Sequence, residues 1–148
     1  MRGNEKERVL SLMVQDHSKI VDLLDEVESR NREGFEELKE AFEIFEWNLE
    51  KHIFAEEKAV FTFYEPEDVT EGYKMLPKLT EHHNYLLNEL KKWRKKIRQH
   101  RALEGVYDFR EYLVKHRRFE EEEFYPKLEE NLDKDQKRRV IAKINEII

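Results

Sequence analysis

The chain contains no cysteine, and only four glycines and three prolines occur among its 148 residues. Without cysteine, disulfide bonds, thiolate metal sites and thiol catalysis are all excluded. Glycine and proline most often interrupt regular structure, so their scarcity leaves few breaks in it. The length suits one domain that can bury a substantial core.

Long apolar runs are absent as well. No stretch approaches the roughly 18 consecutive apolar residues that a membrane-spanning helix needs. The start of the chain also lacks the basic segment followed by an apolar one that marks a secretory signal. We therefore expect a cytoplasmic protein with no membrane partner.

Charged residues are abundant, at 42% of the chain with a net charge of -6. Such a composition can indicate disorder, but the apolar residues recur at spacings of three and four, as one face of a helix requires. A basic stretch lies at 91–101 and contains Trp93. Because the chain is net negative and Trp93 falls on an apolar stripe, we interpret this stretch as a solvated face, balanced by acidic residues of neighbouring helices, and expect no nucleic-acid partner.

Four apolar stripes predict four amphipathic helices and a short fifth one. The expected helices span about 5–30, 34–64, 73–100, 105–130 and 134–147, with loops at 31–33, 65–72 and 101–104. The last helix carries an apolar side made of Val140, Ile141, Ile144, Ile147 and Ile148. We expect this side to pack on the bundle or on a second subunit, forming a homodimer through the C-terminal helix.

Four histidines each fall on the apolar stripe of a different long helix, and two of them are followed four residues later by a glutamate. The six residues are His17, His52, Glu56, His83, His116 and Glu120. Midpoints between successive histidines lie near the expected turns, so the histidines of an up-and-down bundle would be level. A lone core histidine is usually structural, but two buried glutamates beside four such histidines require a cation.

Nitrogen and oxygen donors without sulfur suit iron, manganese or zinc. Six ligands are too many for one tetrahedral ion and too few for two octahedral ions, which leaves room for a bridging oxygen and an added ligand. Ferritin-like sites need a glutamate three residues before a histidine. The residues at that offset are Val14, Leu49, Leu79, Thr80, Ile97 and Leu113, so that alternative fails.

Other polar residues near this layer receive different interpretations. His82 lies one residue off the stripe and is expected to face a neighbour or solvent, although it stays an alternative to His83 or an added ligand. His100 lies about 25 Å along its helix from His83 and is no ligand. The acidic residues Glu57, Glu121, Glu122 and Glu123 are expected to form a solvated face, with Glu121 a rival to Glu120. Three tyrosines are either supporting partners of the site or plain packing residues: Tyr85, Tyr112 and Tyr125.

The chain repeats itself, since each half supplies a lone histidine and then a His-x-x-x-Glu motif. The first half has His17 and then His52 with Glu56, and the second has His83 and then His116 with Glu120. In this respect the sequence resembles the hemerythrin-like family, also called the HHE cation-binding domain, from about Val9 to Leu128. The resemblance implies an all-α, up-and-down four-helix bundle with a short C-terminal fifth helix. It also implies one domain over 1–148, with the bundle at about 5–130.

The resemblance further implies a non-haem di-iron centre with an oxo or hydroxo bridge, iron being favoured over manganese or zinc. The four histidines His17, His52, His83 and His116 would be terminal ligands, and Glu56 and Glu120 bridging carboxylates. The small ligand would be dioxygen, nitric oxide or peroxide, bound for sensing, storage or redox handling. Two alternatives stay open: an oxidase, peroxidase or iron-centre-repair enzyme of nitric oxide stress, and an iron-responsive interaction module.

Two departures from the oxygen-carrying hemerythrins bear on this choice. Those proteins have His-x-x-x-His on the third helix, whereas Leu87 stands at that spacing after His83. They also end in His-x-x-x-x-Asp, where this chain offers Glu120 at four residues and Glu121 at five after His116. A missing fifth histidine opens a coordination position, which argues against reversible oxygen carriage and favours sensing or redox turnover. The iron-centre-repair proteins often carry an added cysteine-bearing segment, and this chain has no cysteine.

Overall fold

The structure is a computed structural model that describes the backbone of residues 8–63 and 69–148 and the side chains of 8–62 and 75–148. Helices account for nearly all of these residues, and no strand occurs among them. The long helices are α2 (Val9–Arg30), α3 (Phe35–Ala55), α4 (Val69–Arg98) and α5 (Val106–Phe119). Shorter ones are α6 (Tyr125–Asn131) and α7 (Lys134–Ile147).

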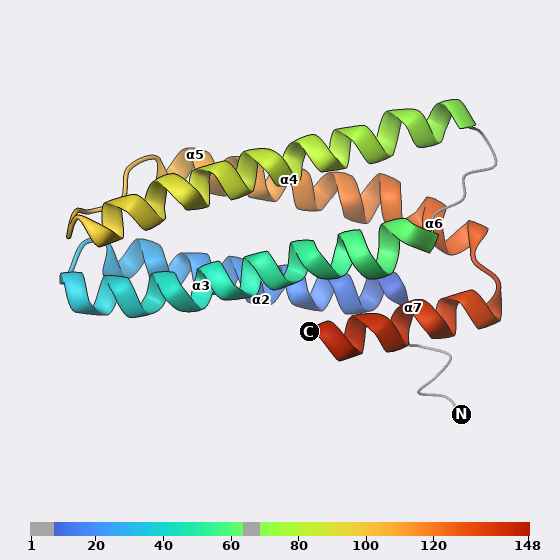
Figure 1. Cartoon of the computed structure of the whole chain (residues 1–148), viewed down its shortest axis with the longest axis horizontal. Coiled ribbons are helices and arrows are strands. Elements are labelled where there is room, and N and C mark those ends of the chain that lie inside the picture. The colour runs from blue at the N-terminus through green and yellow to red at the C-terminus, as the bar shows by residue number, and fades with distance from the viewer. Residues whose placement is uncertain (1–7, 64–68) are drawn as a thin grey trace.

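The four long helices form an up-and-down bundle (Figure 1). Helix α2 packs against α3 and α5, and α4 packs against the same two helices, so the four surround one core. The predicted all-α four-helix bundle with a short C-terminal helix is confirmed. Within the described part of the chain, no helix is long and apolar enough to cross a membrane.

The turns at one end of the bundle are tied together by a side chain. The amide of Asn31 donates to the carbonyl oxygen of Leu103 at 3.1 Å, and its Oδ1 accepts from the Leu103 N–H at 2.9 Å. Gly105 precedes α5 with a φ of 75°, a left-handed conformation that glycine adopts without strain. Helix α4 ends at Arg98, before the predicted residue 100, because His100 itself adopts a left-handed φ of 56° and stacks its ring on Phe35.

Two apolar clusters make up the core. One holds residues such as Leu24, Phe42 and Trp93 near the tied turns, and the other holds residues such as Met13 and Phe124 toward the opposite end. Helix α7 buries Val140 and Ile144 completely in the second cluster. The C-terminal helix therefore packs on the bundle of its own chain, and the predicted homodimer through this helix stays a prediction.

Two predicted helices are not continuous. The expected 34–64 helix changes into a π-helical segment at Glu56–Val60, called η1, and a 3-10 turn at Phe61–Phe63. The expected 105–130 helix changes in the same way at Glu120–Phe124, called η3. A π segment accommodates an extra residue in one turn, and the apolar spacings of three and four do not reveal it. Both segments begin at the glutamate of a His-x-x-x-Glu motif.

The start of α4 also differs from the prediction. The helix already includes 69–72, which were expected to be loop, because one glycine costs a helix only about 1 kcal/mol relative to alanine and does not stop it. Residues 65–68 of that loop, residue 64 of the expected second helix and the expected helical residues 5–7 lie outside the described part of the chain.

Candidate metal centre

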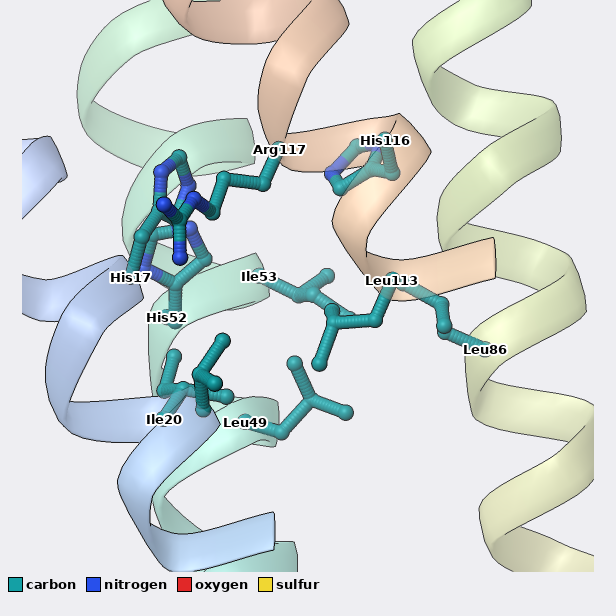
Figure 2. Close-up of a pocket in the computed structure, with 10 residues that line it drawn as sticks. His17, Ile20, Leu49, His52, Ile53, Leu86, Leu113, His116 and Arg117 are labelled. Atoms are coloured by element: carbon teal, nitrogen blue, oxygen red, sulfur yellow. The ribbon is translucent and has the colours of Figure 1, made fainter. Parts of the chain in front are cut away.

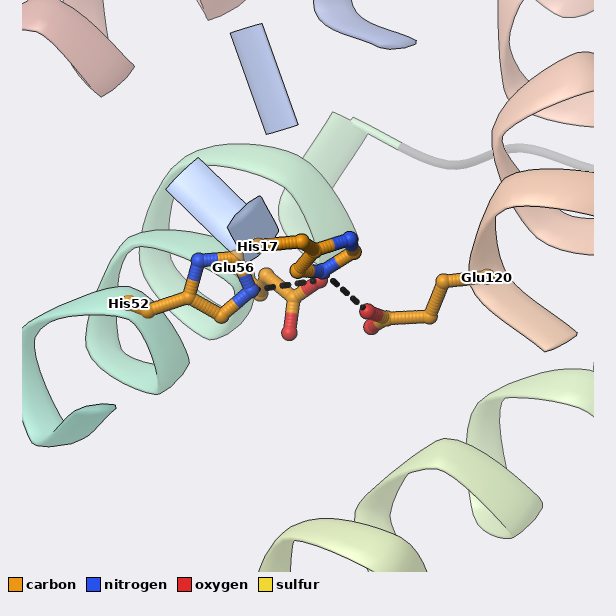
Figure 3. Close-up of side chains that lie close together, drawn as sticks. All are labelled: His17, His52, Glu56 and Glu120. Atoms are coloured by element: carbon orange, nitrogen blue, oxygen red, sulfur yellow. Dashed lines mark hydrogen bonds and ion pairs between the residues drawn. The ribbon is translucent and has the colours of Figure 1, made fainter. Parts of the chain in front are cut away.

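The layer between the two apolar clusters is polar and buried. Each of the six predicted site residues lies in it, with an exposed fraction between 0% for Glu56 and 4% for His17. Helix α2 supplies one histidine, α4 another, and α3 and α5 each supply a histidine whose glutamate follows in the π segment. Figure 3 shows four of these side chains converging from α2, α3, η1 and η3.

The imidazole Nε2 atoms all face the two carboxylates. Glu56 lies 2.9 Å from His83 Nε2 and 3.5 Å from His52 Nε2. Glu120 lies 3.0 Å from His17 Nε2 and 3.3 Å from His116 Nε2. Each carboxylate therefore joins the histidine four residues before it to a histidine of another helix.

The six residues form two overlapping groups of four. One group is His17, His52, Glu56 and Glu120, and the other is Glu56, His83, His116 and Glu120. Within each group one ligand atom per residue lies within 4.8 Å of all the others. Both glutamates belong to both groups, which is the arrangement that two cations bridged by two carboxylates require.

Unpaired buried atoms point to the same conclusion. His52 Nε2, His116 Nε2 and Glu120 Oε2 have no hydrogen-bond partner among the described residues, although each is buried. A buried polar atom without a partner costs about 1–3 kcal/mol. Cations bound between the histidines and glutamates would satisfy all three atoms, so the residues present fit a pair of metal ions.

The two carboxylates titrate far apart. Burial raises the pKa of Glu120 well above its usual value, and the negative charge of Glu56 adds to the effect. Burial opposes the ionisation of Glu56 as well, but His52, Glu120 and His83 overcome it and hold its pKa well below the usual value. Two like charges this close do not both ionise without a cation, so one carboxylate keeps a proton that a metal would displace.

The histidines also differ in their pKa values. Burial lowers the pKa of His17 and of His116, and the shift of His116 is large. Burial works the same way on His52, but the carboxylates of Glu56 and Asp16 outweigh it and raise the pKa of His52 to about 9. Neutral imidazoles such as His17 and His116 are the form in which histidine binds a metal.

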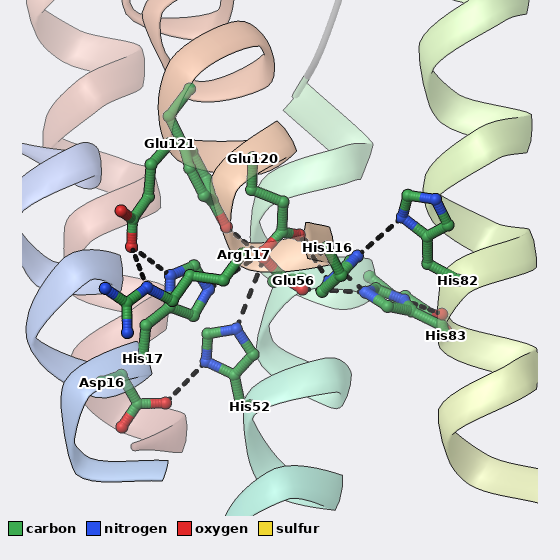
Figure 4. A network of polar contacts seen from close by, with 12 residues as sticks. Asp16, His17, His52, Glu56, His82, His83, His116, Arg117, Glu120 and Glu121 are labelled. Carbon is green, nitrogen blue, oxygen red and sulfur yellow. Dashed lines mark hydrogen bonds and ion pairs between the residues drawn. The ribbon is translucent and has the colours of Figure 1, made fainter. Parts of the chain in front are cut away.

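A second set of side chains holds the outer nitrogen of every imidazole (Figure 4). The Nδ1 of His17 donates to Glu121 at 2.7 Å, and the Nδ1 of His83 donates to Glu57 at 2.8 Å. His52 Nδ1 donates to Asp16 at 2.6 Å, whereas His116 Nδ1 shares a 2.8 Å hydrogen bond with His82 Nδ1. Such partners fix the ring orientation and leave Nε2 free to bind a metal.

These supporting residues were largely missed by the sequence analysis. Asp16 was not singled out, and Glu57 and Glu121 were expected to form a solvated face, whereas both are only partly exposed and each accepts a hydrogen bond from a site histidine. Only Glu122 and Glu123 of that acidic run are exposed. The available signal was position, because each supporting residue is the chain neighbour of a site residue and so lies at the edge of the buried face, within reach of the next helix.

The remaining candidates are placed as follows. Neither His82 nor Glu121 belongs to the two groups of four; each contacts a site histidine from outside. The hydroxyl of Tyr125 donates to Glu56 Oε2. Tyr85 and Tyr112 instead stack on each other with ring centroids 3.8 Å apart. Of the three tyrosines, Tyr125 therefore supports the site directly.

The fold and the layer together define a class: a four-helix bundle with a buried histidine and glutamate site suited to cations. The family model of the hemerythrin HHE cation-binding domain matches residues 8–138, so the chain belongs to this family. No curated protein and no solved structure matched the chain.

Proposed function

We propose that this protein holds two iron ions and binds dioxygen or a related small oxidant for sensing, storage or redox handling. The observation that carries the proposal is the sharing of Glu56 and Glu120 by both groups of four. His17 and His52 would complete one ion's ligands, and His83 and His116 the other's. Bound iron would supply redox chemistry and open positions for a small ligand.

A small cavity beside the layer restricts the size of a ligand that could enter there (Figure 2). Its volume is about 10 Å³, and its walls include the three histidines His17, His52 and His116. The other lining residues are apolar except for Arg117: Ile20, Val21, Leu49, Ile53, Leu86 and Leu113. A space of this size holds about one water-sized molecule. It is too small for an organic substrate, which agrees with a small inorganic ligand.

The surroundings of the centre favour sensing or redox handling over reversible carriage. Leu87, which stands where the oxygen-carrying hemerythrins have a fifth histidine, packs against the apolar cluster around Leu24. Phe61 stacks parallel to the ring of His83 at 5.6 Å between centroids, covering this side with an apolar ring. The His83 and His116 half thus has only its two imidazoles and the shared carboxylates to offer an ion.

A second candidate is an iron-responsive interaction module. Helix α7 contacts η1, the π segment that begins at Glu56, and Val140 and Ile144 share a cluster with Ala59 and Val60. Any adjustment of η1 on metal binding would therefore reach the C-terminal helix. Hydrogen exchange of 134–147 with and without iron tests this, since a module of this kind predicts a metal-dependent change in protection.

The test of the leading proposal is metal content after anaerobic loading with Fe²⁺, followed by optical spectra before and after oxygen is admitted. We expect two irons per chain and an oxygen-dependent absorption band that persists. A band that bleaches while oxygen is consumed over many turnovers, with an added reductant present, would instead establish an oxidase. Failure to bind any metal would contradict the proposal.

The matched control is Glu122→Gln. It removes an exposed carboxylate that is close in sequence to Glu120 but belongs to neither group of four. It should load iron as the unaltered chain does. Equal iron loss in Glu122→Gln and Glu56→Gln would mean that general acidity, and not the buried layer, retains the metal.

A further inference from the structure

The outer face of α3 carries an unusual amount of exposed apolar surface. Of the four large apolar side chains that are exposed in the described part of the chain, three lie on this helix: Ile44 is 46% exposed, Trp47 64% and Phe54 52%. Their spacings of three and seven residues place them on one helical face. This face is opposite the one that buries Phe42, Phe45 and Leu49 in the bundle.

Charged residues flank this apolar surface in a definite order. Glu36, Glu40 and Glu43 precede Trp47 on the same face of α3, and Lys51 follows it. No ion pair joins any of these four side chains to another described residue. By contrast, Arg94 of α4 pairs with Glu46 and Glu50 at the inner edge of α3. We call these seven residues the α3 outer stripe: Glu36, Glu40, Glu43, Ile44, Trp47, Lys51 and Phe54.

The two charges of the α3 outer stripe nearest to Trp47 are complementary when the helix is reversed. Glu43 lies four residues before Trp47 and Lys51 four after it, and both lie within α3. In an antiparallel pair of α3 helices that cross at Trp47, Glu43 of each copy would therefore face Lys51 of the other. In a parallel pair, glutamate would face glutamate and lysine would face lysine.

We propose that the α3 outer stripe is the docking surface for a second copy of this chain, bound antiparallel about a two-fold axis at Trp47. A two-fold interface places the same patch on both copies, as this self-complementary pattern requires. Trp47 supplies the kind of central aromatic anchor that dominates binding energy, and the surrounding charges set the register. The C-terminal helix is not needed, because Val140 and Ile144 are already buried in the bundle.

This interface is independent of the proposed function. The stripe lies on the outer side of α3, whereas His52 is 2% exposed and points into the layer. Dimerisation can therefore be tested on protein with or without iron. Failure of the dimer would leave the metal proposal untouched, and failure of iron binding would leave the dimer untouched.

The experiment is sedimentation of the full chain over a range of concentrations, with charge-reversal variants. We expect a monomer–dimer equilibrium that is weakened about tenfold by Glu43→Lys or by Lys51→Glu, because each change replaces two attractive contacts by two repulsive ones. The double variant Glu43→Lys with Lys51→Glu should dimerise again. An equimolar mixture of the two single variants should form a heterodimer.

The control is Lys91→Glu, which makes the same charge change on an exposed position of α4 and should dimerise as the unaltered chain does. Trp47→Ala should be monomeric, with helical content checked by circular dichroism. A monomer at every concentration would overturn the proposal. So would a dimer that ignores the α3 reversals, since it would use a parallel arrangement, another face or a different partner surface.

Discussion

The two halves of the candidate metal centre share their carboxylates but not their supporting residues. Around His17 and His52, both outer nitrogens donate to carboxylates, those of Glu121 and Asp16. Around His83 and His116, one outer nitrogen donates to Glu57 and the other meets an imidazole, that of His82. The chain thus repeats its candidate ligands more faithfully than the residues that hold them.

The difference follows from two equivalent positions in the repeat. Asp16 directly precedes His17, and His82 directly precedes His83. A carboxylate that accepts the outer N–H of an imidazole makes the ring a stronger metal ligand. A neutral imidazole does this less well, and His82 is favoured in its neutral form because burial, Lys78 and His83 lower its pKa. We therefore expect the His17 and His52 half to bind its ion more tightly.

The largest expected effect comes from replacing a carboxylate that both halves of the site share. Replacing Glu56 or Glu120 by Gln removes a carboxylate that belongs to both groups, so each change should reduce metal content from two ions to fewer than one per chain. The helices should persist, because the two apolar clusters are unaltered. Metal analysis with circular dichroism checks this outcome. Full occupancy in both variants would disprove the bridging assignment.

A selective loss is expected from Asp16→Asn. The neutral amide accepts the hydrogen bond from His52 Nδ1 more weakly than the carboxylate does. The affinity of this half for its ion should therefore fall by about 10–100-fold. Anaerobic calorimetric titration with Fe²⁺ should show the tighter step weakened and the other unchanged. Asp22→Asn, an exposed change on the same helix, is the control. Equal weakening of both steps would mean that the halves are not independent in this way.

The converse change is His82→Asp, which gives the second half the residue that the first half has. The aspartate oxygen would take the place of the His82 nitrogen 2.8 Å from His116 Nδ1. The weaker step should then gain up to about tenfold in affinity, bringing the two steps together. His82→Ala should still bind two ions in excess iron, with only the weaker step reduced. A change confined to the tighter step would contradict the comparison.

The parts that sequence could predict are those with a long repeated pattern. Spacings of three and four over many residues predicted the four helices, and the interruption of each stripe by a histidine or glutamate predicted the buried layer. The π segments at Glu56 and Glu120 could not be predicted that way. An added residue in one turn allows two adjacent residues, Phe124 and Tyr125, to be buried together. A stripe with spacings of three and four through Glu120 and Phe124 does not include Tyr125.

The supporting residues were missed for a related reason. Glu57 and Glu121 stand in acidic runs that a helical pattern assigns to solvent, and their side chains are still partly exposed, at 40% and 21%. Their contacts with His83 and His17 depend on the separation and rotation of two packed helices. A pattern on one helix does not contain that information, whereas it does indicate which side of that helix is apolar.

The smallest expected effect concerns the one tyrosine that contacts a shared carboxylate. Tyr125→Phe removes the hydroxyl that donates to Glu56 but keeps the fully buried ring in the apolar cluster. Because a bound cation can satisfy the Glu56 oxygen, both halves should keep their ions. The iron-free protein should lose about 1 kcal/mol of unfolding free energy, the usual worth of one hydrogen bond. Denaturant unfolding of iron-free and iron-loaded protein measures both states. Since Glu56 belongs to both halves, a loss of affinity in only one of them would show that Tyr125 distinguishes the halves, contrary to this expectation.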